Sequence, residues 1–161
     1  MDVYGIASDQ LRVGVKRHGA ELCRLTMADG TELLWNGDPT WWSGQAPVLF
    51  PVVGALQGGR LRHQGASYPL NRHGFARTRD FRMVRLTAHS VRLRLEDDEE
   101  TRKAYPFRFQ FDLDFSVEED TLTVRHELRR QRTTKVDGTR LVSTLERALT
   151  LARRLHAPGN V

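Results

Sequence analysis

The sequence predicts an all-β protein: an antiparallel β-sandwich that is incomplete, followed by a helix near its C-terminal end. Two observations carry this prediction. Apolar and polar residues alternate in several segments of the first 128 residues, a period of two that directs one face of a strand into a core. Short polar turns separate these segments, which is typical of antiparallel sheets with one face exposed to water.

The alternation appears in four places along the chain. It begins at residues 11–15, returns at 91–95, and is longest at Phe107–Val117, where six apolar residues face one side and five polar residues the other. After a polar turn at 118–120 it continues from Leu122 to Leu128. No helical periodicity is found before residue 140, so we expect the body of the protein to consist of strands.

The chain changes character near Arg129, and we divide it into residues 1–128 and a tail of residues 129–161. The tail holds eight Lys and Arg against two acidic residues, a net +6. Since the whole chain carries +5, the body carries −1. Apolar residues between Leu141 and Leu155 recur at steps of three and four, which predicts an amphipathic helix. We interpret the tail as foreign to the fold, the product of a frameshift or rearrangement. A genuine divergent helix is the alternative.

Composition limits the class of protein. At 161 residues we expect one domain. No apolar run reaches the roughly 18 residues of a membrane span, and no signal peptide is recognised, so we expect a cytoplasmic protein without membrane contact. The single cysteine, Cys23, lies in a strand-like segment and is expected to be a small buried hydrophobe. The basic tail has no aromatic residue to stack on bases, so nucleic acid is not the expected partner.

One short segment combines groups suited to a polar ligand. Residues 71–77 read Asn-Arg-His-Gly-Phe-Ala-Arg and follow a glycine-rich stretch. His73 can exchange a proton near neutral pH, Gly74 lets the backbone approach a ligand, and the Arg77 guanidinium can bind hydroxyls or anions. An ion pair between Arg77 and Asp80 is the structural alternative for that arginine.

Several motifs in this order resemble the aldose 1-epimerase (galactose mutarotase-like) family. They are Gly19–Leu22, Glu32–Trp35, the run Pro47–Gly54, the segment Gly65–Leu70 and the His-Gly-Phe-Ala-Arg motif, followed by Asp98–Arg102 and Tyr105–Phe107. The resemblance ends at about His126 and so covers the N-terminal portion of the family.

The resemblance implies a supersandwich fold, and interconversion of the α and β anomers of a hexose or hexose phosphate by general acid/base catalysis. It implies His73 as the catalytic position of this chain, Arg77, Gly74 and Arg60 as substrate-binding residues, a small sugar or sugar phosphate as ligand, and neither metal nor cofactor. Arg60 is the weakest of these, because the family's Gly-Arg pair corresponds here to Gly54 and Ala55.

The later family motifs, a His-Pro and a glutamate that serves as general base, are missing from this chain. The resemblance therefore implies a truncated homologue with impaired catalysis. The alternative is a non-catalytic sugar-binding β-sandwich fragment. Loss of the later strands leaves sheet edges unpaired, so we also expect self-association through these edges.

Other conspicuous residues receive structural interpretations. Trp35 and Trp41 are expected to close one end of the sandwich, while Trp42 is left open between that role and stacking on a sugar. The acidic run at residues 96–100 lacks the spacing of a calcium loop and is read as a solvated turn. His18, His63 and His89 have no metal-ligand spacing.

Overall fold

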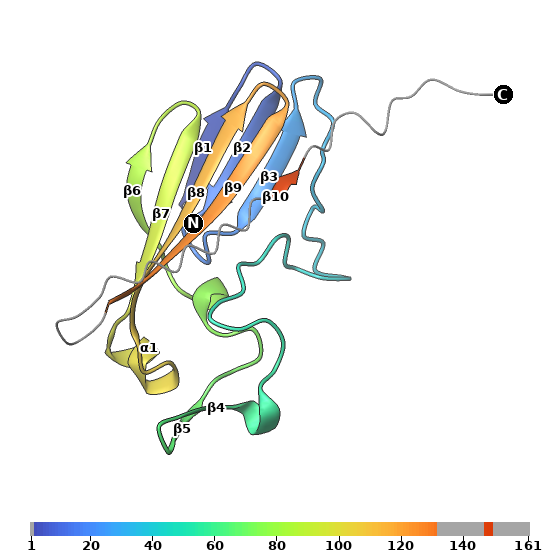
Figure 1. Cartoon of the computed structure of the whole chain (residues 1–161). Helices are drawn as coiled ribbons and strands as arrows, with labels where there is room; N and C mark the ends of the chain where they lie inside the picture. Colours follow the sequence, from blue (N-terminus) through green and yellow to red (C-terminus); the bar gives the residue numbers. More distant parts are fainter. Residues whose placement is uncertain (1, 132–146, 150–161) are drawn as a thin grey trace.

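The computed structural model describes residues 2–131 and 147–149, which form ten strands in three antiparallel sheets. A three-stranded sheet has the order β1-β2-β3, a five-stranded sheet the order β10-β9-β8-β7-β6, and β4 pairs with β5 (Figure 1). The strands are β1 Val3–Ala7, β2 Leu11–Lys16, β3 Leu22–Met27, β4 Arg60–His63, β5 Ala66–Pro69, β6 Arg82–Leu86, β7 Ser90–Glu96, β8 Arg108–Glu118, β9 Thr121–Gln131 and β10 Arg147–Leu149. The all-β, antiparallel prediction is confirmed.

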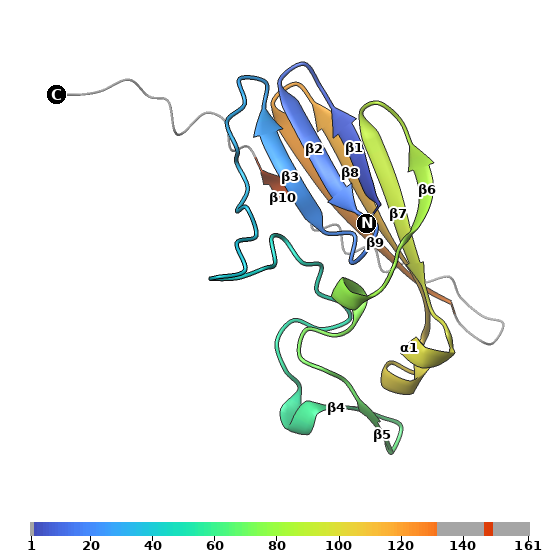
Figure 2. The same cartoon turned by 180° about the vertical axis from the view of Figure 1, so that it is seen from behind.

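The two larger sheets pack face to face, as the front and back views both show (Figures 1 and 2). One buried cluster takes residues from both layers: Leu11, Val13 and Val15 of β2 lie in it with Leu93 of β7 and Leu113 of β8. The predicted alternation thus corresponds to β2, β7, β8 and β9, with their apolar residues directed between the layers.

The opposite face of the five-stranded sheet carries a ladder of charged and polar side chains. Asp112 of β8 is fully buried, and Arg94 of β7 donates to both of its carboxylate oxygens at 2.6 and 2.7 Å. Two residues along the strands, on the same face, Arg92 donates to Asp114 at 2.5 Å. These cross-strand pairs fix the register of β7 against β8.

The acidic run is not the solvated turn that was expected, because it begins a short helix. Asp98 caps α1 (Glu99–Ala104): its carboxylate accepts from the Thr101 backbone N–H at 2.7 Å, while the Thr101 hydroxyl accepts from the Asp98 backbone N–H at 2.8 Å. This reciprocal capping box, with Glu99 and Glu100 in the first turn, stabilises a helix too short to show a periodic pattern. The expectation of no helix before residue 140 is wrong here.

The tryptophans do not close the sandwich. Trp35, Trp41 and Trp42 lie in the long connection between β3 and the short 3-10 helix η1 (Gln57–Gly59), and all three are exposed. An aromatic residue of the same connection that does enter the core is Phe50, whose ring stacks on Phe111 at 4.6 Å between centroids. The Cys23 side chain is half-buried, with its thiol 3.4 Å from the Gly14 carbonyl.

The described strands extend past the expected boundary at residue 128. Strand β9 continues to Gln131, and β10 pairs with it in antiparallel register, Arg147 opposite Val124. The predicted helix between Leu141 and Leu155 is therefore wrong at Arg147–Leu149. The rest of that prediction lies outside the described residues, and the interpretation of the tail as foreign to the fold stays a prediction.

Candidate functional site

His73 is held by Gly54 through two hydrogen bonds. The His73 backbone N–H donates to the Gly54 carbonyl at 2.8 Å, and the Gly54 N–H donates to Nδ1 of the imidazole at 2.9 Å. His73 is half-buried and adopts a left-handed backbone with φ of 69°. A non-glycine residue in this region carries local strain, which the two bonds to Gly54 offset.

Both ring nitrogens of His73 face N–H donors. The Gly54 backbone N–H donates to Nδ1, and the Nε of exposed Arg72 donates to Nε2 at 3.1 Å. A neutral imidazole accepts at only one of its nitrogens, so these two hydrogen bonds compete. The bond to Nδ1 comes from the backbone, whereas the Arg72 side chain is exposed, so Nε2 is the ring nitrogen that a ligand reaches when it displaces Arg72.

Gly74 joins this segment to the core. Its φ is 70°, and a Cβ placed on it would collide with the Phe50 carbonyl. The same carbonyl accepts from the backbone N–H groups of Phe75 at 2.9 Å and Ala76 at 3.2 Å. Gly74 therefore acts through the close passage of two chain segments, which fixes the position of His73.

Beneath the segment lies an aromatic cluster. The Phe75 ring meets Phe50 edge-on with 5.9 Å between centroids, and Tyr105 meets Phe50 at 5.8 Å. Burial raises the pKa of the Tyr105 phenol, with the charge of Arg130 acting in the opposite sense. The cluster forms the apolar base of the site, and its edge-to-face contacts restrict the orientation of the Phe75 ring.

Arg77 lies on the second 3-10 helix η2 (Ala76–Thr78), with an exposed side chain. The ion pair considered for it is not formed, because Asp80 instead contacts His18 Nδ1 at 2.9 Å and Arg17 at 3.5 Å. Hydrogen bonding from His18, ahead of the charge of Arg17, lowers the pKa of Asp80. Within residues 2–131, no ion pair engages the Arg77 guanidinium.

Arg60 is directed elsewhere. It begins β4, and its guanidinium donates to the Ser67 hydroxyl at 2.7 Å and the Ser67 carbonyl at 3.0 Å across the β4–β5 hairpin. Those bonds give Arg60 a structural role in the hairpin. The structure thus brings His73 and Gly74 together with Gly54 and Arg72, which the sequence analysis named within motifs but did not assign to the site. The adjacency of Arg72 to His73 in the motif was the available signal.

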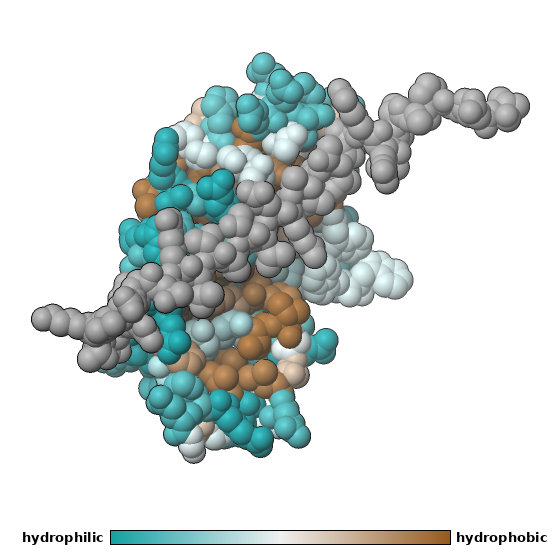
Figure 3. All heavy atoms as spheres, in the orientation of Figure 1, coloured by the Kyte–Doolittle hydropathy of each residue, from teal (hydrophilic) through white to brown (hydrophobic). Residues whose placement is uncertain are grey.

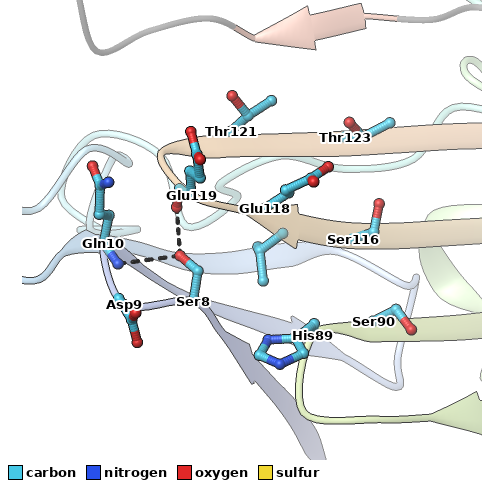
Figure 4. Close-up of a pocket in the computed structure, with 11 residues that line it drawn as sticks. Ser8, Asp9, Gln10, His89, Ser90, Ser116, Glu118, Glu119, Thr121 and Thr123 are labelled. Atoms are coloured by element: carbon cyan, nitrogen blue, oxygen red, sulfur yellow. Dashed lines mark hydrogen bonds between the residues drawn. The ribbon is translucent and has the colours of Figure 1, made fainter.

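A hollow of about 690 Å³ lies away from His73, at the end of β8 beside the β8–β9 turn (Figure 4). Val117 lines it, about 26 Å along the strand from Phe109, which contacts the aromatic cluster. Two of its polar side chains are engaged in contacts within the protein: Ser8 donates to the Glu119 carbonyl at 2.5 Å, and His89 Nδ1 bonds to the Ala7 carbonyl at 2.6 Å. None of the sequence-predicted site residues lines this hollow.

Across the described ranges, no group of three or more His, Cys, Asp or Glu side chains is placed to hold a metal ion. In the same residues, no helix has the length and apolar character to cross a membrane.

Comparison with known proteins decides the family. The family model for aldose 1-epimerase matches residues 2–139, which is most of the chain and extends past residue 128. The chain belongs to the aldose 1-epimerase family. Its match to the N-terminal portion agrees with the resemblance seen in the sequence.

Solved structures give the same picture of this aldose 1-epimerase family member. A galactose mutarotase related enzyme from Lactobacillus acidophilus is 35% identical with a TM-score of 0.79, over 81% of this chain and 44% of that one. A galactose mutarotase-like protein from Lactobacillus casei is 29% identical, also with a TM-score of 0.79, over 83% and 46%. Among curated proteins, the LacX protein of Lactococcus lactis is 27% identical over 135 residues. This match covers 81% of the chain but 45% of LacX, so the chain spans less than half the length of these relatives.

Proposed function

We propose that this chain is the sugar-binding N-terminal part of a mutarotase that interconverts the α and β anomers of a hexose or hexose phosphate, with catalysis impaired in the chain as it stands. The observation that carries the proposal is the fixed imidazole of His73. Its Nδ1 is held by the Gly54 N–H, so Nε2 is the ring nitrogen that can donate to a sugar oxygen when the sugar displaces the exposed Arg72 side chain.

The chemistry of mutarotation defines what His73 contributes. A base must remove the proton of the C1 hydroxyl while an acid protonates the ring oxygen, so that the ring opens, rotates and closes on the other face. A neutral imidazole that donates through Nε2 can hold the ring-oxygen region in place. The ring nitrogens of His73 have no carboxylate partner among the described residues, and a separate acid and base are needed for proton transfer.

Arg77 supplies the preference for a phosphate in this proposal. Its guanidinium is exposed and without an ion pair in residues 2–131, and it is four positions from His73. A guanidinium can bind two phosphate oxygens at once, which gives it an advantage over neutral donors. Arg77→Ala is therefore expected to weaken the binding of a hexose 6-phosphate more than the binding of the unphosphorylated hexose.

Binding is tested by isothermal titration calorimetry of the full chain with glucose, galactose and their 6-phosphates. Loss of one hydrogen bond of about 1.4 kcal/mol corresponds to a tenfold change in affinity, so His73→Ala is expected to weaken binding about tenfold. His63→Ala, in the β4–β5 hairpin, is the matched control. Absence of binding at high millimolar concentrations of all four sugars rejects the proposal.

Turnover is a separate measurement, made by polarimetry on freshly dissolved α anomers. A rate above that of buffer which falls in His73→Ala supports catalysis by the chain itself. An unchanged rate together with sugar binding favours the second candidate, a non-catalytic sugar-binding fragment. The observation in favour of that candidate is the lack of a carboxylate partner for His73 in the described residues.

A further inference from the structure

A smaller hollow, of about 360 Å³, lies on the outer face of the five-stranded sheet, near its β6 edge. We call it the arginine hollow, and it is lined by Val84 and Arg85 of β6, Ser90 and Arg92 of β7, and Asp114 of β8. This face is turned toward the viewer in Figure 1, and the surface over β6 and β7 is mainly hydrophilic (Figure 3). Asp114 lies about 17 Å along β8 from Phe109, which contacts the aromatic cluster, so the hollow is separate from the candidate site.

An irregularity in β6 directs two consecutive side chains to this hollow. Met83 pairs with Leu93 and Arg85 with Arg92, so the register shifts by one residue between Met83 and Arg85. In a regular strand Val84 and Arg85 would point to opposite faces, whereas here both line the hollow. Bulges re-aim side chains in this way and are frequent beside functional sites. The irregularity thus adds the Arg85 guanidinium to the face that carries Arg92.

The side chains in this row of the sheet carry an excess of positive charge. Arg92 donates through Nε to one oxygen of Asp114 at 2.5 Å. Arg85 on one side of this pair and Arg125, opposite Asp114 on β9, are both exposed, and neither forms an ion pair within the described residues. Three guanidinium groups therefore accompany one carboxylate, a net charge of +2 in this row. Such a surface attracts an anion, and a guanidinium can bind two oxygens of a carboxylate or phosphate at once.

Asp114 also has an unused acceptor. Its Oδ1 accepts from Arg92, but its Oδ2 is buried and has no hydrogen-bond partner among the residues that the structure describes. A buried polar atom of this kind destabilises the protein unless a donor reaches it. The side chains of Arg92 and Asp114 keep 34% and 24% of their surface exposed, so the pair is not closed off from solvent. A hydroxyl group of a ligand in the hollow is a donor suited to Oδ2.

Hydroxyl groups continue the polar surface from the arginine hollow toward the β8–β9 turn. Ser90 lines both this hollow and the larger one of about 690 Å³. Ser116 and Thr123 follow it in register on β8 and β9, and Figure 4 shows them on neighbouring strands. Neither of these two hydroxyl groups is engaged by another of the described residues. Beyond them lie the exposed carboxylates of Glu118 and Glu119, which repel an anion at that end.

We propose that the arginine hollow and the adjoining hydroxyl groups bind a hydroxylated anion, namely a sugar that carries a carboxylate or a phosphate. Its anionic group binds Arg85 and Arg92, and one of its hydroxyl groups donates to Asp114 Oδ2. The remaining hydroxyl groups bind Ser116 and Thr123. Neutral sugars lack the charge that the arginines recognise, so they bind here more weakly. This binding is independent of the function proposed for His73.

The test is isothermal titration calorimetry of the full chain with glucuronate, glucose 6-phosphate, glucose and inorganic phosphate. We expect at least one of the two anionic sugars to bind more tightly than glucose and more tightly than inorganic phosphate. Tighter binding of glucuronate identifies the anionic group as a carboxylate, and tighter binding of glucose 6-phosphate identifies it as a phosphate. Each titration is repeated in His73→Ala, in which the affinity at the arginine hollow is expected to stay unchanged.

Two variants test the two halves of the site. Arg85→Gln removes an exposed guanidinium that has no ion pair in the described ranges, and it is expected to weaken the preferred anionic sugar at least tenfold. Arg12→Gln is the matched control, because it removes the same charge from an exposed position on β2 in the other sheet. Ser116→Ala is expected to weaken the anionic sugar but not inorganic phosphate, which has no sugar hydroxyl to place there.

Several results overturn the proposal. Equal effects of Arg85→Gln and Arg12→Gln reduce the binding to general attraction of anions by a basic chain. Equal affinity for inorganic phosphate and both anionic sugars means an adventitious ion only. Binding that is lost in His73→Ala but kept in Arg85→Gln places the ligand at the candidate site instead. Failure of the proposed function looks different, because neutral hexoses then do not bind while the anionic sugar still depends on Arg85.

Discussion

The Cα of Gly74 lies so close to the carbonyl of Phe50 that no side chain fits between them. Phe50 belongs to the core between the sheets, and Gly74 follows the histidine that we assign to the sugar. The contact therefore transmits the rigidity of the core to the candidate site. Glycine is required at position 74 for two reasons: the contact leaves no room for a Cβ, and the backbone has a positive φ.

Replacement of Gly74 by alanine is expected to cost about 3 kcal/mol of the free energy of unfolding, because the Cβ displaces backbone atoms and the left-handed conformation becomes strained. Urea unfolding measures the loss. Gly65→Ala is the control, since Gly65 has φ of 78° but open space around it, and only the conformational cost of about 1 kcal/mol is expected there. Equal costs for both variants would contradict the close contact.

Replacement of Arg94 by methionine is expected to destabilise the protein by about 3–5 kcal/mol, because the fully buried Asp112 carboxylate loses its cationic partner. The double variant Arg94→Met, Asp112→Leu is expected to recover most of that loss, since no charge is then left buried. A double-mutant cycle from urea unfolding measures the coupling. Lys103→Met, at an exposed pair with Glu100, should change stability by less than about 0.5 kcal/mol.

Protonation of the Glu21 carboxylate is expected to lower the free energy of unfolding at acidic pH. Partial burial raises its pKa, but hydrogen bonds from the Gln45 and Ala46 backbone and the pairing with Lys16 prevail and lower it below the usual 4.5. The stabilisation is therefore complete above pH 4.5 and is lost as the pH falls through the lower folded value. Urea midpoints between pH 7 and pH 3 test this.

The matched variants for this prediction are Glu21→Gln and Glu118→Gln. At neutral pH, Glu21→Gln should be less stable than the wild type by about 1–2 kcal/mol, and the difference should shrink in acid. Glu118 is exposed at the end of β8, and its variant should follow the wild type throughout. A constant difference for Glu21→Gln at all pH values would exclude the carboxylate as its cause.

Protonation of His126 on β9 is expected to lower the free energy of unfolding in a higher pH range than that of Glu21. Burial lowers its pKa below the usual 6.5, and its ring lies 5.9 Å from that of Phe111. The unfolded chain takes up a proton before the folded one, so stability is lost as the pH falls below 6.5 through the folded value. In His126→Leu, urea midpoints at pH 7.5 and 5.5 should lie closer together than in the wild type. An unchanged difference between the two urea midpoints would exclude His126 as the cause of the pH dependence.

The structural features that could be predicted from the sequence were those that leave a local pattern of apolar and polar residues. The alternation of apolar residues in β8 is local, so its inward face could be predicted before any partner strand was known. The helix α1 was missed because its stability comes from one capping box rather than from periodicity. The exposure of Trp41 was missed because large aromatic side chains are usually covered.

The sequence by itself determined the strands β2, β7, β8 and β9, the antiparallel sheet class and the family, since these follow from periodicity and from motifs of residues adjacent in the chain. Only the tertiary structure decided that Gly54 holds the His73 ring, that Arg60 serves the β4–β5 hairpin, and that Asp80 pairs with His18 rather than Arg77. The physical reason is that hydrogen bonds and ion pairs depend on distances of about 3 Å between atoms. The packing of distant segments sets those distances, and no local pattern records them.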